Sequence, residues 1–140
     1  MRYYRDVTSD MTGGVPQFSV FSRLCPSRAA LEVVTNRWGL LALRALSARP
    51  LRFNELRRRI DGISQKMLSQ TLHALERDGF VNRHLHTTFP LHVEYSLTPL
   101  GAGMADQLAE VINLVESRMP DVLTAQRRGI LPPSPDRKAS

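Results

Sequence analysis

Apolar positions in the first part of the chain recur at the spacing of α-helices. This pattern predicts four helices, at about 26–34, 37–48, 53–60 and 64–78. Ser64 is a good N-cap for the fourth helix, and Gly79 is typical of a helix C-terminus. Asp61-Gly62 predicts a turn between the third and fourth helices. These two helices and their turn therefore form a helix-turn-helix pair.

The period changes from helical to alternating after Gly79. Apolar and polar residues alternate over 81–86 and again over 93–97, and the connection at about 87–91 contains Pro90. This alternation predicts a hairpin of two strands. Thr98-Pro99 is another helix start, and apolar positions mark a long helix over 100–122 that Pro120 kinks or splits.

This order of elements predicts a mainly α fold with a small antiparallel β-hairpin, the winged helix-turn-helix. In that fold the second helix of the pair enters the major groove of DNA, and the hairpin reaches the backbone or minor groove. The long last helix has a spare apolar face, which predicts a two-fold dimer contact with the first helix, so that the terminal helices dimerise. We expect a flexible arm over 1–22, the folded domain over 23–126 and a disordered basic tail over 127–140.

The positive charge of the chain is nearly all arginine. The 140 residues include 17 Arg and 2 Lys against 13 acidic residues, a formal net charge of +6. Residues 49–86 carry a net charge of +4, whereas residues 96–125 carry −3. A GC-rich genome also favours arginine codons, but a uniform bias would not separate the charges in this way. Because Arg pairs with phosphate and with guanine edges, the pattern predicts that the helix-turn-helix meets nucleic acid.

The outward face of the fourth helix carries side chains suited to reading base edges. With its leucines buried, a helical projection and the cap position give the candidate DNA contacts as Ser64, Gln65, Lys66, Ser69, Gln70, His73 and Arg77. Gln bonds adenine and Lys bonds guanine, so the first half of the helix is expected to enter deepest. His73 and Arg77 are expected nearer to phosphates. The alternative is that these are the ordinary polar residues of a surface helix.

Two arginines outside that helix are further candidates for DNA contact. Arg52 opens the short third helix, where it contacts phosphate or pairs locally with Glu55. Arg83, on the first strand of the hairpin, reaches phosphate or pairs inward with Glu94 across the hairpin. Both alternatives stay open for each arginine.

His84 and His86 lie on the opposite face of that first strand from Arg83. We expect them to be exposed residues of the wing that approach DNA. They could also ligate a metal as an i, i+2 pair, but the sequence offers no evident third ligand, so we expect no metal site. The sequence has no H-E-x-x-H, C-x-x-C or phosphate-binding glycine motif, and we expect no cofactor.

Cys25 is the single cysteine, which excludes an internal disulfide and any multi-cysteine zinc site. It precedes Pro26 at the start of the first helix, with Arg23 and Arg28 close in sequence. A helix N-terminus and nearby cations favour the reactive thiolate, so Cys25 is a candidate redox or regulatory residue. The alternative is a small buried residue packed in the dimer interface.

Several segments in the same order strongly resemble the HxlR family of bacterial winged-helix transcriptional regulators. They are Cys25-Pro26, Asn36-Arg37-Trp38, LRFNELR at 51–57, GISQKMLSQTL at 62–72, LERDGFVNR at 75–83 and PLHVEYSLTPLG at 90–101. The resemblance covers roughly residues 25–115. It implies a homodimer related to MarR-type regulators that binds a two-fold operator near the promoter it controls. It also implies that a cysteine near the N-terminus can sense oxidants or electrophiles, as in some members.

We therefore expect a cytoplasmic, sequence-specific regulator that binds double-stranded DNA at a pseudo-palindromic operator as a homodimer. Repression is the expected mode, and activation is the alternative. A small-molecule effector is compatible with this function but is not identified by the sequence. A winged helix that serves as a protein-interaction module without specific DNA readout is the second hypothesis. An enzyme is not expected, because the sequence shows no acid/base pair, nucleophile–base spacing or metal set.

Overall fold

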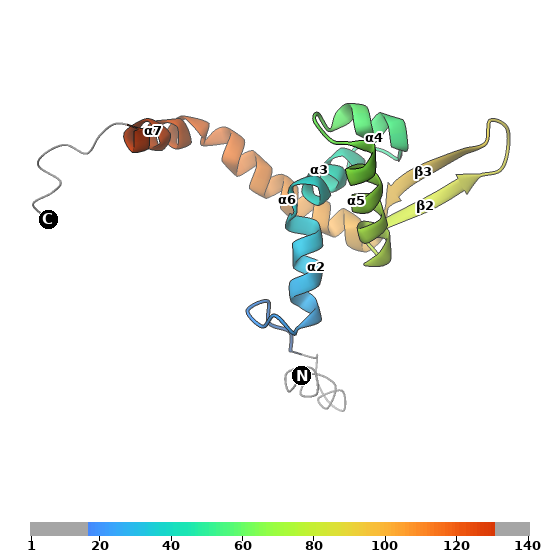
Figure 1. Ribbon diagram of the computed structural model, residues 1–140, viewed down its shortest axis with the longest axis horizontal. Coiled ribbons are helices and arrows are strands. Elements are labelled where there is room, and N and C mark those ends of the chain that lie inside the picture. Colours follow the sequence, from blue (N-terminus) through green and yellow to red (C-terminus); the bar gives the residue numbers. More distant parts are fainter. Residues whose placement is uncertain (1–16, 131–140) are drawn as a thin grey trace, which may run out of the picture. The chain divides into compact units, whose positions relative to one another are not determined.

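The computed structural model describes residues 17–130 of the chain. Its elements, shown in Figure 1, are α2 (Pro26–Thr35), α3 (Arg37–Leu46), β1 (Leu51–Arg52), α4 (Phe53–Arg59), α5 (Gln65–Arg77), β2 (Val81–His86), β3 (His92–Leu97), α6 (Pro99–Ser117) and α7 (Met119–Ile130). The mainly helical fold with a β-hairpin, expected from the sequence, is confirmed. The chain divides into two compact units, with Asp106 as the last residue of the first and Gln107 as the first residue of the second.

The structure differs from the expected elements at two places. β1 pairs with β3, so the sheet has three strands in the order β1-β3-β2 instead of two. Two residues are too short a run to show an alternating pattern, which explains why the sequence did not reveal this strand. The split of the long last helix near Pro120 is confirmed: α6 ends at Ser117 and α7 begins at Met119, which puts the proline in the first turn of the new helix. α7 continues to Ile130, beyond the expected end of the folded domain at Gln126.

Helices α3, α4 and α5 share the core of the first unit. The most deeply buried large side chains include Val34, Leu43, Leu56, Leu68, Leu72, Leu75 and Val81. Each of these leucines gains about 1.5–3 kcal/mol from leaving water. The expected buried stripe of α5 is thus confirmed, and its burial determines which face of α5 remains in solvent.

Local interactions determine where α5 begins and ends. The Ser64 hydroxyl accepts a hydrogen bond from the Met67 backbone N–H at 3.0 Å, as expected of an N-cap. Ile63 and Leu68 flank this cap and are both buried. The residue after Asp61 and the residue after Asp78 have positive φ angles of 84° and 82°, and both are glycines, for which this conformation is not strained. The turn and the helix end therefore require these glycines.

Thr98 connects the start of α6 to the end of α5. Its hydroxyl donates to the Gly79 carbonyl at 2.6 Å and accepts from the Gly101 N–H at 2.9 Å. A β-carbon at Gly101 would overlap the Phe80 carbonyl oxygen, so only glycine permits this close approach. These contacts hold the start of α6 against the end of α5 and the start of β2.

The second unit contains the rest of α6, and α7. Val111, Leu114 and Val115 are at least half exposed there, and their i, i+3, i+4 spacing puts them on one helical face. Val122 and Leu123 of α7 are also exposed. Among residues 17–130, no helix is long and apolar enough to cross a membrane.

Candidate nucleic-acid interface

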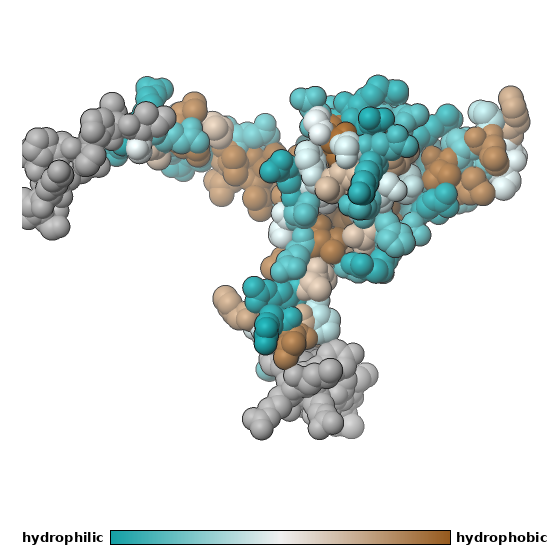
Figure 2. Space-filling model, viewed as in Figure 1, coloured by the Kyte–Doolittle hydropathy of each residue, from teal (hydrophilic) through white to brown (hydrophobic). Residues whose placement is uncertain are grey.

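The outward face of α5 is polar and open to solvent. Figure 2 shows a mainly hydrophilic surface over α4 and α5. The seven candidate residues at the cap and along the helix are all exposed, namely Ser64, Gln65, Lys66, Ser69, Gln70, His73 and Arg77. Because the leucines of α5 face the core, these side chains are directed to solvent without any unfavourable burial of polar groups.

The first half of α5 presents four polar residues on one exposed face. Gln65, Lys66, Ser69 and Gln70 line one shallow hollow. Amide, ammonium and hydroxyl groups thus converge within two turns of the helix N-terminus, where the unpaired backbone N–H groups also favour a phosphate. The structure brings together the residues that the sequence predicted to enter the groove deepest.

The second half of α5 has a different environment. Arg77 pairs with Asp78 across 3.1 Å, which partly neutralises its charge. Gln70 and Arg77 also line a hollow with Glu32 and Val33 of α2. Arg77 is therefore closer to acidic groups than the helical projection implied, and it contributes less positive charge than Lys66.

The structure resolves the two alternatives for Arg52. Glu55 forms its ion pair with Arg49, at 3.0 Å, and receives a hydrogen bond from the Arg52 backbone N–H, also at 3.0 Å. These two interactions, the backbone hydrogen bond first, lower the pKa of Glu55. The Arg52 side chain itself is exposed and lines a polar hollow with Asn54 and Arg58. Over the residues that it describes, the structure does not show the alternative of a side-chain salt bridge between Arg52 and Glu55, and the exposed Arg52 guanidinium is available for a phosphate.

The wing, defined as β2, β3 and residues 87–91, has two distinct faces. Arg83 is opposite Tyr95 in the register of β2 and β3, whereas Glu94 is opposite His84. The proposed pairing of Arg83 with Glu94 is therefore wrong, because the two side chains lie on opposite faces of the sheet. Arg83 is exposed and has no ion pair among the residues that the structure describes.

The other face of the wing gathers polar side chains from three strands. His84 is opposite Glu94, His86 is opposite His92, and Arg52 of β1 is opposite Glu94 on its other side. The rings of His86 and His92 are stacked with centroids 4.4 Å apart, and the edge of His84 packs on His86 at 4.5 Å. His84 is exposed as predicted, but His86 is half-buried.

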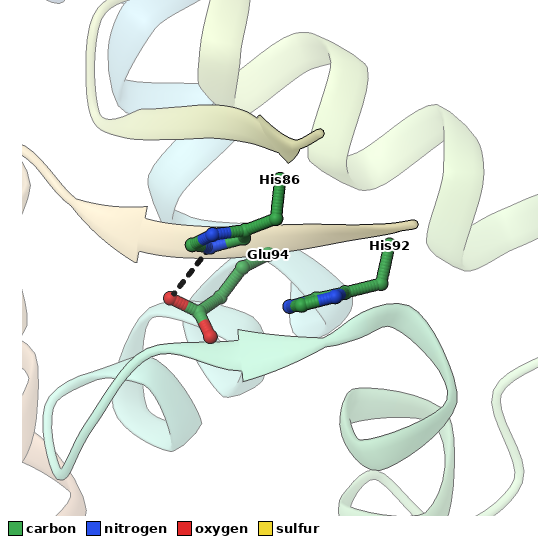
Figure 3. A group of neighbouring side chains, drawn as sticks. All are labelled: His86, His92 and Glu94. Carbon is green, nitrogen blue, oxygen red and sulfur yellow. Dashed lines mark ion pairs between the residues drawn. The ribbon is translucent and has the colours of Figure 1, made fainter. Parts of the chain in front are cut away.

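Two residues of this face were missed as functional candidates. His92 and Glu94 each offer a ligand atom that lies within 4.8 Å of one on His86 (Figure 3). The sequence argument against a metal, the lack of a third ligand beside His84 and His86, therefore does not hold in the structure. The signal was present in the hairpin itself, because a loop over 87–91 makes His86 and His92 partners across the strands.

Cys25 occupies the N-cap position of α2, as predicted. Its side chain is buried, with 2% of its surface exposed, and its Sγ lies 3.1 Å from the Ser27 hydroxyl. A thiol-reactive molecule therefore reaches this sulfur only after a structural change that exposes it.

The comparisons with known proteins agree with this geometry. The family model described as HxlR-like helix-turn-helix matches residues 33–122. The HTH-type transcriptional regulator YtfH of Escherichia coli K12 is 48% identical over 108 residues, which cover 77% of this chain and 86% of YtfH. The structure of the transcriptional regulator ytfH from Salmonella typhimurium is 49% identical, with a TM-score of 0.73, and the match covers 80% of this chain and 99% of that one.

A third similar protein is the regulator YodB from Bacillus subtilis, whose structure is known in a reduced and a diamide-treated form. The diamide-treated form is 31% identical to this chain, with a TM-score of 0.58, and the match covers 69% of this chain and 96% of YodB. The reduced form is 32% identical with the same TM-score.

Proposed function

The chain belongs to the HxlR-like helix-turn-helix family of transcriptional regulators, and we propose that it binds a two-fold DNA operator as a homodimer and represses the adjacent promoter. The observation that carries this proposal is the exposed face of polar residues at the start of α5. Gln65, Lys66, Ser69 and Gln70 present the side-chain types that read base edges in the major groove. Catalysis has no part in this function, and we place it in the cytoplasm.

The DNA contacts divide into two classes by chemistry. Gln65, Lys66, Ser69 and Gln70 contact base edges, and Ser64 positions the helix start against a phosphate. The DNA phosphate backbone is contacted by five residues from α5, from the start of α4 and from the wing: Arg52, His73, Arg77, Arg83 and His84. His86 supports His84 from the same face of the wing. Base contacts determine which sequence is bound, whereas backbone contacts raise affinity for every sequence.

The apolar face of α6 supports the homodimer. Val111, Leu114 and Val115 expose a continuous apolar strip, which costs free energy unless another surface covers it. A second copy of the chain would cover it and place two α5 helices about 34 Å apart, one turn of DNA. Such spacing requires a pseudo-palindromic operator.

Redox control through Cys25 is the regulatory part of the proposal. Cys25 is at a helix N-terminus, which favours the thiolate, and YodB has been crystallised reduced and after diamide treatment. The burial of Cys25 implies that its oxidation is coupled to a structural change that exposes the sulfur at the start of α2. A small-molecule effector remains compatible with the same fold.

Selection of bound genomic fragments from the source organism, read by sequencing, tests the proposed function. The expected result is a small set of fragments that share an inverted repeat with half-sites one turn apart. Gln70→Ala is expected to weaken binding to the selected sequence about 10-fold or more while leaving binding to unrelated DNA unchanged. Arg44→Ala is the control, because Arg44 is exposed on α3, outside the helix-turn-helix of α4 and α5. This variant is expected to bind the selected sequence as the wild type does. Enrichment of no common sequence would favour the protein-interaction module instead.

A further inference from the structure

We propose that His86, His92 and Glu94, which the hairpin register brings together on the polar face of the wing, form a binding site for a divalent transition metal ion, with Zn²⁺ as the ion to test. No part of the helix-turn-helix function requires these three residues to converge. The site is independent of the DNA contacts of α5.

The geometry of the three side chains is close to that of a metal site. One ligand atom from each residue lies within 4.8 Å of the others. The His86 Nε2 and Glu94 Oε1 atoms are 3.5 Å apart. Two ligands at about 2.1 Å from a tetrahedral zinc ion are separated by about 3.4 Å, so this pair already has the required spacing. The His92 ligand atom lies within 4.8 Å of the other two, and its ring must turn out of the stack with His86 to complete the set.

The hydrogen bond of His92 prepares its ring for a metal. The Nδ1 atom lies 2.7 Å from the Pro90 carbonyl oxygen. A carbonyl oxygen can only accept, so Nδ1 carries the proton and the lone pair of Nε2 is left to act as a ligand. Metal-binding histidines commonly have this second hydrogen bond, which fixes both the tautomer and the ring orientation.

The Nε2 atom of His86 is the second observation that points to a ligand. It is screened from solvent and has no hydrogen-bond partner among residues 17–130, although a Glu94 carboxylate oxygen lies 3.5 Å away. A buried polar atom without a partner costs free energy, and a metal ion that binds this nitrogen and the carboxylate would remove that cost. In Figure 3 both imidazole rings lie beside the Glu94 carboxylate, around one shared space.

The donor set selects the class of ion. Two imidazoles and one carboxylate suit zinc and its neighbours in the first transition series better than Mg²⁺ or Ca²⁺, which prefer oxygen ligands. Three protein ligands leave at least one position for water, as in open zinc sites. A bound ion would join β2 to β3. It would also change the net charge at the Glu94 carboxylate from −1 to +1. Arg52 opposes Glu94 in the register without an ion pair between their described side chains, so the carboxylate is not already neutralised by it.

Zinc binding by the full chain, freed of metal with a chelator, tests the proposal directly. Competition with a chromophoric chelator is expected to show one Zn²⁺ per chain. His92→Ala and Glu94→Gln are each expected to weaken the affinity more than 10-fold, because each removes one of three ligands. His73→Ala removes an exposed histidine of α5 outside the cluster and is the matched control, expected to bind Zn²⁺ as the wild type does. Co²⁺ in place of Zn²⁺ is expected to give visible absorption bands that the same two variants lose.

Far-UV circular dichroism controls for folding, and Glu94→Gln, which keeps the size of the side chain, carries the test if His92→Ala unfolds. Absence of equimolar Zn²⁺ binding would overturn the proposal and leave His86 and Glu94 as an ion pair only. Equal affinity of the wild type and the two variants would also overturn it, since the metal would then lie elsewhere. No DNA is present in these measurements, so their outcome is independent of the proposed operator binding.

Discussion

Ser64 allows the stability of α5 to be separated from its contact with DNA. Its hydroxyl accepts the Met67 N–H at 3.0 Å and caps the helix, and its side chain is exposed at the proposed interface. Ser64→Ala removes the acceptor, whereas Ser64→Asp keeps an acceptor and adds a negative charge. The two substitutions therefore perturb different properties of the same position.

The cap determines the expected effect on stability. Loss of an N-cap hydrogen bond costs about 1 kcal/mol of unfolding free energy, which lowers the melting temperature by about 4 °C in a domain of this size. Asp caps helices about as well as Ser and interacts favourably with the helix dipole. Ser64→Asp is therefore expected to remain within about 0.5 kcal/mol of the wild type.

The added charge determines the expected effect on DNA binding. A carboxylate about 6 Å from a phosphate, at an effective dielectric constant of about 40, costs about 1.4 kcal/mol, a tenfold loss of affinity. Ser64→Ala adds no charge and is expected to bind DNA within about threefold of the wild type at a temperature where it is folded. Ser64→Asp is thus expected to be the more stable of the two variants and Ser64→Ala the tighter DNA binder.

Urea denaturation and fluorescence-anisotropy titration with the selected operator measure the two quantities. Ser69→Ala, on the same face but with no capping hydrogen bond among the described interactions, is the control for stability. If Ser64→Asp bound DNA as tightly as the wild type, the N-terminus of α5 would not face DNA, and the assignment of α5 as the recognition helix would be refuted.

Four further predictions follow from the same structure. Arg52→Ala is expected to reduce the slope of log affinity against log salt by about 0.9, because its exposed guanidinium is proposed to neutralise one phosphate, and an unchanged slope would exclude that contact. Cys25→Ser is expected to keep its DNA bound in diamide at a concentration that releases the wild type, and equal release would exclude Cys25 as the sensor. Leu114→Glu, in the exposed strip of α6, is expected to convert a dimer to a monomer in sedimentation velocity, with Glu116→Gln as the control; a wild type that is monomeric would contradict the dimer itself. Glu55→Gln is expected to be less stable than the wild type at pH 7; because the pKa of Glu55 is lowered in the fold, its contribution is present above its usual 4.5 and disappears as the pH falls through the folded value, so urea midpoints of the two proteins should converge in acid.

The helical part of the fold was predictable because its signals are local. Ser64 and Gly79 bracket α5 within one segment of sequence, and the spacing of Leu68, Leu72 and Leu75 determines its buried face. The two-residue strand β1 was not predictable, because it exists only through pairing with Tyr95 and Glu94 far along the chain. Tertiary pairing of this kind leaves no periodic trace in so short a run.

The wing shows why correct element boundaries do not by themselves yield a correct site. The expected loop of residues 87–91 was confirmed, and it already implied that His86 is opposite His92 and His84 opposite Glu94. Treating His84 and His86 only as neighbours along one strand overlooks this pairing, and the alternative of an Arg83–Glu94 pair fails because alternation puts these two side chains on opposite faces. In a hairpin the side chains that contact one another are those of residues equidistant from the turn, and they need not be close in sequence. Glu94 is therefore opposite His84 and contacts its diagonal neighbour His86, not Arg83, so that the face of the wing proposed to approach DNA contains a histidine–carboxylate cluster in place of an additional arginine contact.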